Sequence, residues 1–269
     1  MIYTVQGHPL YAYTGGKIFD PAKPTAVFIH GVLNDHSVWI LQTRYFAHHG
    51  WNVLAIDLPG HGRSGGKASA SVEEAAECIG HLLDAAGVAK AILIGHSFGS
   101  LIAMQTAANL PDRVSQLALV GTAYPMRVSP TLLESSLKDP HKAIHMVTIF
   151  SHAKMAPPPS ALGPGTWLLG GSKALMRRVL ASNPHENIFH IGFKACNQYA
   201  QAEVAMTQVT CPTLFLLGQK DQMTPPKAAQ SLIHLTKNAQ VVLVNAGHQL
   251  MVEAPEETLN ALINFCEHP

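Results

Sequence analysis

A serine between two glycines is the residue in this sequence best suited to covalent chemistry. Gly95-His96-Ser97-Phe98-Gly99 follows a short apolar run, KAILIG, and precedes an apolar stretch with helical spacing. A serine on a tight strand-to-helix turn is held above the edge of a sheet, and glycines two residues to either side let neighbouring backbone pass without a clash. The pattern therefore predicts that Ser97 is a nucleophile; the alternative is a glycine-rich turn that carries an inert serine.

A serine hydroxyl needs a base whose pKa lies near the working pH, which points to histidine. The chain has 16 histidines. His248 stands out because Ala246-Gly247-His248 directly follows the last expected strand, VVLV, and this places it at the same sheet edge as Ser97. None of the histidines on the expected helices forms a pair with a nearby carboxylate on one helix face, so we predict no metal site.

The third group must orient the imidazole and stabilise its charged form, so it should be a carboxylate on another loop at that edge. Asp221 meets this requirement because it follows the apolar run PTLFLLG, in the segment GQKDQMTPP. It could instead cap a turn before Pro225, since aspartate is favoured in turns. An acid after the run that ends at Gly121 is the rival, but no carboxylate occurs there until Glu134.

The elements that must position these residues are strands and helices in alternation. Segments 1–7 and 9–14 suggest an antiparallel hairpin that turns at Gly7-His8-Pro9. Short apolar runs, typical of strands buried on both faces of a parallel sheet, occur at 25–30, 51–57, 90–95, 115–121, 212–218 and 239–244. Helical spacing occurs at 37–49, 71–86, 98–109, 225–236 and 255–267, with starts indicated at Ser71 and Pro255. This order predicts a twisted sheet covered by helices, with chemistry at the carboxyl ends of its strands.

The alternation stops between residues 124 and 206, where a loop at 155–165 separates helical segments. We interpret 124–206 as a helical cap inserted into a core made of 1–123 and 207–269, because lids sit where a rigid sheet can position them. A peripheral helical layer with no part in substrate choice is the alternative.

With these motifs in the order Ser, Asp, His, the chain resembles capped, cofactor-free serine esterases of the α/β-hydrolase fold. The resemblance covers nearly the whole chain and implies a mostly parallel twisted sheet of about eight strands. FIHGVLNDHSVW resembles the family's loop after the third strand, which implies that the N–H groups of Val32 and Phe98 form the oxyanion hole. AIDLPGHGRSGG resembles the loop after the fourth strand; Asp57, His61 and Arg63 there are interpreted as structural, as is His30.

The resemblance implies acyl transfer through a covalent intermediate on Ser97, with neither a metal nor an organic cofactor. A carboxylic ester or lactone hydrolase is the leading hypothesis. A carbon–carbon hydrolase or perhydrolase of the same fold, and a ligand receptor that retains the triad, stay open. The predicted walls of the substrate pocket are apolar side chains, each of which could equally be core: Leu33, Phe98, Met126, Met146, Phe150, Trp167, Phe193 and Met223.

Composition limits the possible partners. Lys plus Arg (18) nearly balances Asp plus Glu (17), so the basic field that would attract nucleic acid or an anionic membrane is absent. No window approaches the roughly 18 apolar residues of a membrane helix, and no leader is readable at the amino terminus. The four cysteines are scattered, as in a reduced protein. We therefore predict a cytoplasmic monomer or homo-oligomer acting on a small molecule.

Overall fold

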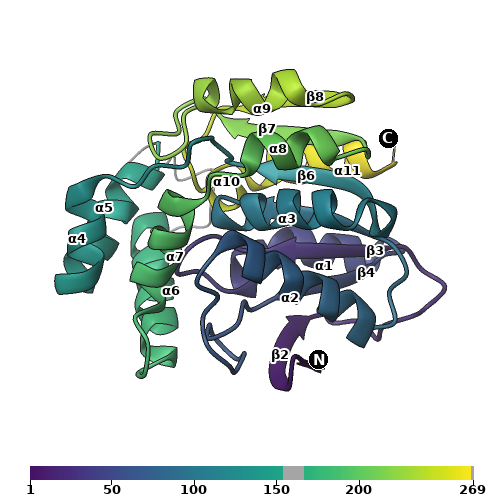
Figure 1. The fold of residues 1–269 in the computed structure, drawn as a ribbon, viewed down its shortest axis with the longest axis horizontal. Coiled ribbons are helices and arrows are strands. Elements are labelled where there is room, and N and C mark those ends of the chain that lie inside the picture. The colour runs from purple at the N-terminus through teal and green to yellow at the C-terminus, as the bar shows by residue number, and fades with distance from the viewer. Residues whose placement is uncertain (154–166, 268–269) are drawn as a thin grey trace.

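The computed structural model describes residues 1–153 and 167–267, and its centre is one eight-stranded sheet (Figure 1). The strand order is β1-β2-β4-β3-β5-β6-β7-β8. The two amino-terminal strands pair antiparallel, β2 pairs antiparallel with β4, and all other pairs are parallel. The expected fold class is confirmed. The strands are β1 (Ile2–Val5), β2 (His8–Tyr13), β3 (Thr25–Ile29), β4 (Asn52–Ile56), β5 (Ala91–His96), β6 (Val114–Val120), β7 (Thr213–Gly218) and β8 (Ala239–Val244).

The amino-terminal hairpin forms, but its turn lies one residue earlier than expected. β1 ends at Val5 and β2 begins at His8, so the turn is Gln6-Gly7. Both residues have positive φ, 49° and 82°. Two consecutive positive φ angles characterise the hairpin turn whose twist matches the strands. Pro9, whose ring holds φ near −65°, cannot occupy such a turn and lies in β2 instead.

The sheet is covered on both faces because its central strands, β3, β5, β6 and β7, are apolar at most positions. Alternate residues of one strand point to opposite faces, so Leu93 of β5 joins one core cluster and Ile94 joins the other. The first cluster packs under α2 (Val72–Ala85), α3 (Phe98–Asn109), α8 (Ala202–Gln208) and α9 (Gln230–Leu235). The second packs under α1 (Ile40–His48), α10 (Leu250–Glu253) and α11 (Pro255–Glu267).

Helix starts follow the expected capping chemistry. Ser71 accepts a hydrogen bond from Glu74 N at 3.1 Å, and the Glu74 carboxylate accepts from Ala70 N at 2.7 Å. This reciprocal arrangement satisfies donors that the first turn of α2 would otherwise leave free. The starts indicated at Ser71 and Pro255 therefore agree with the structure, where Ser71 caps α2 and α11 begins at Pro255.

The described residues between β6 and β7 form five further helices, of which the first four lie at one end of the sheet (Figure 1). These four share a core cluster of their own, which includes Ile144, Val179 and Phe189. The helix that follows them, α8, packs on α3 and belongs to the first core cluster instead. The division at 124 and 206 stays a prediction, and the loop expected at 155–165 lies outside the described residues. The four helices are α4 (Pro130–Lys138), α5 (Pro140–Ser151), α6 (Leu168–Ser182) and α7 (Ile188–Gln198).

Candidate active site

Ser97 occupies the turn between β5 and α3 with a strained backbone. Its φ is 53° and its ψ is −118°, a conformation that non-glycine residues rarely adopt. The turn is held by hydrogen bonds from Ser97 N to Val120 O at 2.9 Å and from Ser100 N to Ser97 O at 2.8 Å. Strain of this kind persists only where surrounding structure imposes it, and it clusters at functional sites.

The two flanking glycines are required by close backbone approach. A Cβ on Gly95 would overlap Gly99 O, and a Cβ on Gly99 would overlap Ile29 O, with His30 O only 2.7 Å away. The first helical turn of α3 therefore packs directly against the end of β3. This contact is the structural reason for the Gly-x-Ser-x-Gly spacing.

His248 and Asp221 form a buried hydrogen-bonded pair. His248 Nδ1 lies 2.8 Å from Asp221 Oδ2, and the other carboxylate oxygen accepts from Met223 N and Thr224 N, both at 2.8 Å. Burial acts to raise the pKa of the Asp221 carboxyl, but His248 and the hydrogen bonds from Thr224 outweigh it and hold that pKa below its ordinary value. The carboxylate is thus ionised at neutral pH and suited to stabilise an imidazolium.

Thr224 is a member of this network that sequence reasoning missed. Its hydroxyl lies 2.7 Å from Asp221 Oδ2, 3.0 Å from His248 Nδ1 and 2.9 Å from Gly121 O. One hydroxyl has one proton and two lone pairs, so it donates to one oxygen while accepting from the ring N–H. The available signal was a threonine three residues after the candidate aspartate, just before two prolines.

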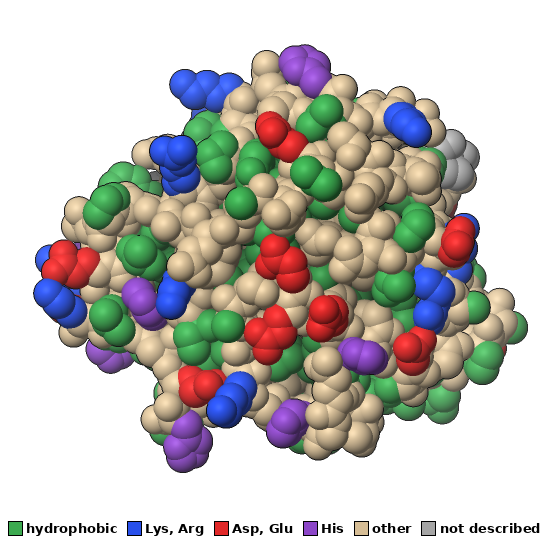
Figure 2. Space-filling view, viewed as in Figure 1, with side chains coloured by type: hydrophobic (Ala, Val, Ile, Leu, Met, Phe, Trp, Pro, Cys, Tyr) green, Lys and Arg blue, Asp and Glu red, His purple; other side chains and the backbone are tan. Residues whose placement is uncertain are grey.

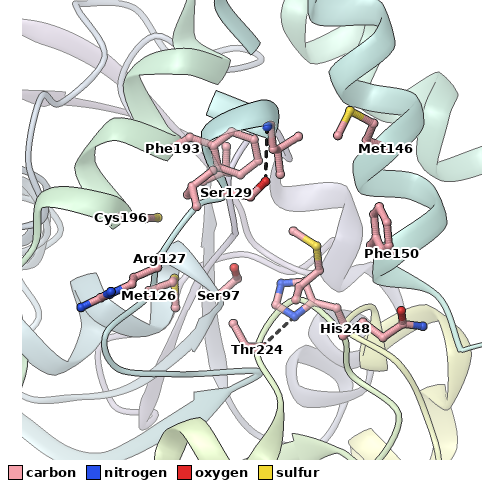
Figure 3. A pocket seen from close by; sticks show the side chains of 15 residues that line it. Ser97, Met126, Arg127, Ser129, Met146, Phe150, Phe193, Cys196, Thr224 and His248 are labelled. Atoms are coloured by element: carbon pink, nitrogen blue, oxygen red, sulfur yellow. Dashed lines mark hydrogen bonds between the residues drawn. The ribbon is translucent and has the colours of Figure 1, made fainter. Parts of the chain in front are cut away.

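Ser97 and His248 face one cavity but are not hydrogen-bonded to each other in this conformation (Figure 3). Within the described residues, the hydrogen bonds of the imidazole join it to Asp221 and Thr224 alone. His96 fixes the other side of the loop, because its Nε2–H donates to His248 O at 2.8 Å. Catalytic hydrogen bonds are often long before substrate binds, so this spacing is compatible with proton transfer. Of the three residues predicted to react together, Asp221 and His248 are hydrogen-bonded, and Ser97 is not bonded to His248.

Two backbone N–H groups beside Ser97 make no hydrogen bond to any described residue. They belong to Val32, in the loop after β3, and to Phe98, the first residue of α3, whose N–H has no acceptor within the helix. His30 shapes the first of these loops, because its Nε2 accepts from Leu58 N at 3.0 Å and its Nδ1 donates to Gly31 O at 2.8 Å. Both N–H groups remain available to an oxyanion.

A cavity of about 300 Å³ lies between the sheet edge and the helices α4, α5 and α7. Met126, Met146, Phe150, Phe193 and Met223 of the expected pocket line it, and Figure 3 shows the first four around Ser97 and His248. The lining also has residues that sequence reasoning did not select: Arg127, Val128, Ser129, Leu132, Cys196 and Gln222.

Three residues expected in the pocket lie elsewhere. Leu33 has a φ of 55° and is fully buried in the core cluster shared by helices α4 to α7. The Phe98 side chain is buried in the first core cluster. Trp167 is 59% exposed and borders a separate cavity with Leu168. The expectation that these side chains line the same cavity as Ser97 is wrong.

Asp57 has the structural surroundings that its loop sequence predicts. It is fully buried and accepts hydrogen bonds from His36 N, His36 Nδ1 and Arg63 N at 2.7–2.9 Å. Asp35, His36 and Asp57 present oxygen and nitrogen atoms within 4.8 Å of one another, a spacing that a metal ion could use. These atoms are already engaged, however, since Arg178 contacts Asp35 Oδ2 at 2.7 Å. A cation would have to displace an arginine.

The surface of the molecule carries mixed charge. Figure 2 shows basic and acidic side chains scattered over one face, with hydrophobic side chains between them. None of the helices in the described part of the chain is long and apolar enough to cross a bilayer.

Comparisons with known proteins give relatives along most of the chain. A family model described as alpha/beta hydrolase fold matches residues 24–150. The (E)-2-((N-methylformamido)methylene)succinate hydrolase of Acinetobacter baylyi is 27% identical over 258 residues, which cover 90% of this chain and 89% of that protein. Bovine Protein ABHD8 is also 27% identical, over 244 residues; the match covers 88% of this chain but 54% of ABHD8, so the chain spans about half the length of that relative.

Solved structures resemble the whole chain. The enol-lactonase from Burkholderia xenovorans superposes with a TM-score of 0.84 and 18% identity, and the match covers 100% of both chains. At this identity the likeness shows a shared fold.

Proposed function

We propose that this chain, which has the α/β-hydrolase fold, cleaves small carboxylic esters or lactones through an acyl-enzyme on Ser97. The observation that carries the proposal is the buried Asp221–His248 pair, whose histidine lines the same cavity as a serine held at positive φ. An ionised carboxylate that orients an imidazole, with a serine on the other side of the ring, is the arrangement that activates a hydroxyl for attack on an acyl carbon.

The proposed reaction has two halves. In the first, Ser97 Oγ attacks the acyl carbon while His248 takes its proton, and the oxyanion accepts hydrogen bonds from Val32 N–H and Phe98 N–H. His248 then gives the proton to the departing alcohol oxygen. In the second half, water attacks the acyl-enzyme with His248 as base, which releases the carboxylic acid and restores the serine. Asp221 keeps the imidazole in the Nδ1–H tautomer throughout.

The cavity supports an uncharged acyl group as the substrate's recognised part. Its wall beside the serine is dominated by methionine and phenylalanine side chains, and Arg127 is an exposed residue of that wall. An apolar acyl group would bind by burial of its surface, at about 25 cal/mol per Å². We also propose that the protein is cytoplasmic and acts on a small molecule, since its net charge is +1.

The decisive experiment compares wild type, Ser97→Ala and Ser129→Ala on nitrophenyl esters of increasing acyl length. Ser129 is the matched control because it lines the same cavity and its hydroxyl already accepts a hydrogen bond from Leu132 N at 3.3 Å. We expect Ser97→Ala to lose about 10³-fold or more in kcat while keeping its circular dichroism spectrum, and Ser129→Ala to stay within about tenfold of wild type. A fluorophosphonate should label wild type and not Ser97→Ala.

Other outcomes separate the rival functions. Unchanged activity in Ser97→Ala would overturn the mechanism. If the wild-type protein binds esters but hydrolyses none of them at any acyl length, the protein is better explained as a receptor. Cleavage of a dienoic diketone, or peroxide-dependent halogenation, in preference to ester hydrolysis would favour a carbon–carbon hydrolase or a perhydrolase.

A further inference from the structure

The loop that carries His248 is attached to the end of a cap helix. The carbonyl oxygen of Ser151, the last residue of α5, accepts hydrogen bonds from His248 N at 2.7 Å and from Gln249 N at 3.2 Å. Ser151 is fully buried, so these bonds are shielded from competing water. The backbone position of the proposed base thus depends on where α5 ends.

Glu253 reinforces this attachment from the other side. Its Oε1 accepts from Gly247 N at 3.1 Å, in the histidine loop, and its Oε2 accepts from Ala153 N at 2.7 Å, just beyond α5. One carboxylate therefore joins two segments that lie about a hundred residues apart in the chain. Hydrogen bonds to a charged acceptor are the stronger kind, so the bridge is suited to hold both segments in one place.

The two segments are also in tight steric contact. A Cβ on Gly247 would lie 2.6 Å from Ala153 N, 2.8 Å from Ser151 O and 2.8 Å from Glu253 Oε1. No gap is left in which the histidine loop could move independently of the cap. Glycine at 247 is needed for this approach of backbone to backbone.

The helix attached in this way also forms part of the substrate cavity. Met146 and Phe150 are both on α5, and Figure 3 shows them above His248 on the side of the cavity opposite Arg127. An acyl chain that packs against these side chains would press on the same helix whose end holds the His248 backbone. Occupation of the acyl site and placement of the imidazole are therefore linked through one rigid element.

We propose that Glu253 is a positioning residue whose hydrogen bonds hold α5 against the His248 loop. Acyl groups that contact Met146 and Phe150 would then place the imidazole within hydrogen-bonding distance of Ser97. The inference rests on the proposed ester hydrolysis at Ser97. It differs from a purely stabilising role, which would change how much protein is folded and leave the rate per folded active site unchanged.

The test uses Glu253→Ala and Glu253→Gln, with Glu256→Ala as the matched control on the exposed face of α11. Alanine removes both acceptors. Glutamine keeps one acceptor oxygen and presents an NH₂ group to the other N–H, so it should open one of the two contacts. Active sites are titrated with a fluorophosphonate, and kcat per titrated site is measured on acetyl, butyryl and hexanoyl nitrophenyl esters.

We expect kcat per site to fall about 10- to 100-fold in Glu253→Ala, since displacement of a catalytic group by about 1 Å costs that much. Glu253→Gln should lie between Glu253→Ala and wild type, and Glu256→Ala should match wild type. The gain in kcat from acetyl to hexanoyl esters in wild type should disappear in Glu253→Ala. Gly247→Ala, which forces the segments apart without changing charge, should flatten the acyl-length profile in the same way.

The inference is overturned if Glu253→Ala and Glu253→Gln keep wild-type kcat per titrated site and the wild-type acyl-length profile, whatever happens to their melting temperatures. That result would leave the proposed function intact, because wild type would still be active and Ser97→Ala inactive. Failure of the proposed function would instead show as inactivity of wild type itself.

Discussion

Replacing Thr224 with valine tests the hydrogen-bond network behind His248 without disturbing the three groups proposed to react. Valine has nearly the shape of threonine but lacks the hydroxyl, which lies 2.7 Å from Asp221 Oδ2 and 3.0 Å from His248 Nδ1. The Asp221 carboxylate would keep its bonds from Met223 N, Thr224 N and the imidazole. It would lose the one side-chain hydroxyl that also restrains the ring.

A hydrogen bond to a charged group contributes about 1.5–3 kcal/mol. If that amount is lost from the transition state, in which the imidazole becomes charged, kcat falls about 10- to 100-fold at 1.36 kcal/mol per factor of ten. The single Thr224 proton is donated to Asp221 Oδ2 or to Gly121 O, and valine cannot donate to either, so the free energy of unfolding should also fall by about 1 kcal/mol.

The assay is kcat on a nitrophenyl ester, measured for wild type, Thr224→Val and Thr224→Ser. Serine retains the hydroxyl and loses only a methyl group, so its kcat should stay within about threefold of wild type. The reasoning is refuted if Thr224→Val and Thr224→Ser have the same kcat, because the hydroxyl would then contribute nothing to the orientation of the imidazole.

Two further predictions concern buried polar groups outside the reacting set. Asp57→Ala should lower the free energy of unfolding by about 3 kcal/mol, because it removes a buried acceptor from the partly buried donors of His36 and Arg63. Its kcat per titrated site should change less than about threefold, and a selective loss of kcat would instead make Asp57 catalytic. Burial lowers the pKa of His61 to about 4 and of His96 to about 3, so both stay neutral in the folded protein while the unfolded chain takes up protons below its ordinary pKa of 6.5. The free energy of unfolding should therefore fall as the pH drops from about 6.5 toward 4, by about 1 kcal/mol per pH unit for each histidine, and urea titrations that show a flat profile would contradict this.

The amino-acid sequence was sufficient for the fold class and for the elements that carry the proposed triad. Apolar runs such as TLFLLG are typical of strands buried on both faces of a sheet, and the helical spacing between them indicates parallel crossovers. The glycines around Ser97 indicated a tight strand-to-helix turn, because no residue with a side chain fits at those positions. These features are local, so a single sequence reveals them.

The sequence did not allow us to predict in which direction the side chains around the site point. Leu33 directly follows Val32 in the loop after β3, as a pocket residue would, but it has a positive φ and its side chain is buried in the core. Trp167 is apolar and lies within the expected cap, but it borders a different cavity. Apolar character predicts burial and does not say on which side of an element the side chain lies.

Chain order and strand periodicity alone placed Ser97, Asp221 and His248 at one edge of the sheet, because parallel strands direct their following loops to the same side. Tertiary structure decided what surrounds them: the hydroxyl of Thr224 between the carboxylate and the imidazole, and the Glu253 carboxylate between the histidine loop and α5. The reason is that periodicity depends on neighbours within a few residues, whereas these contacts join segments brought together only when the helices pack.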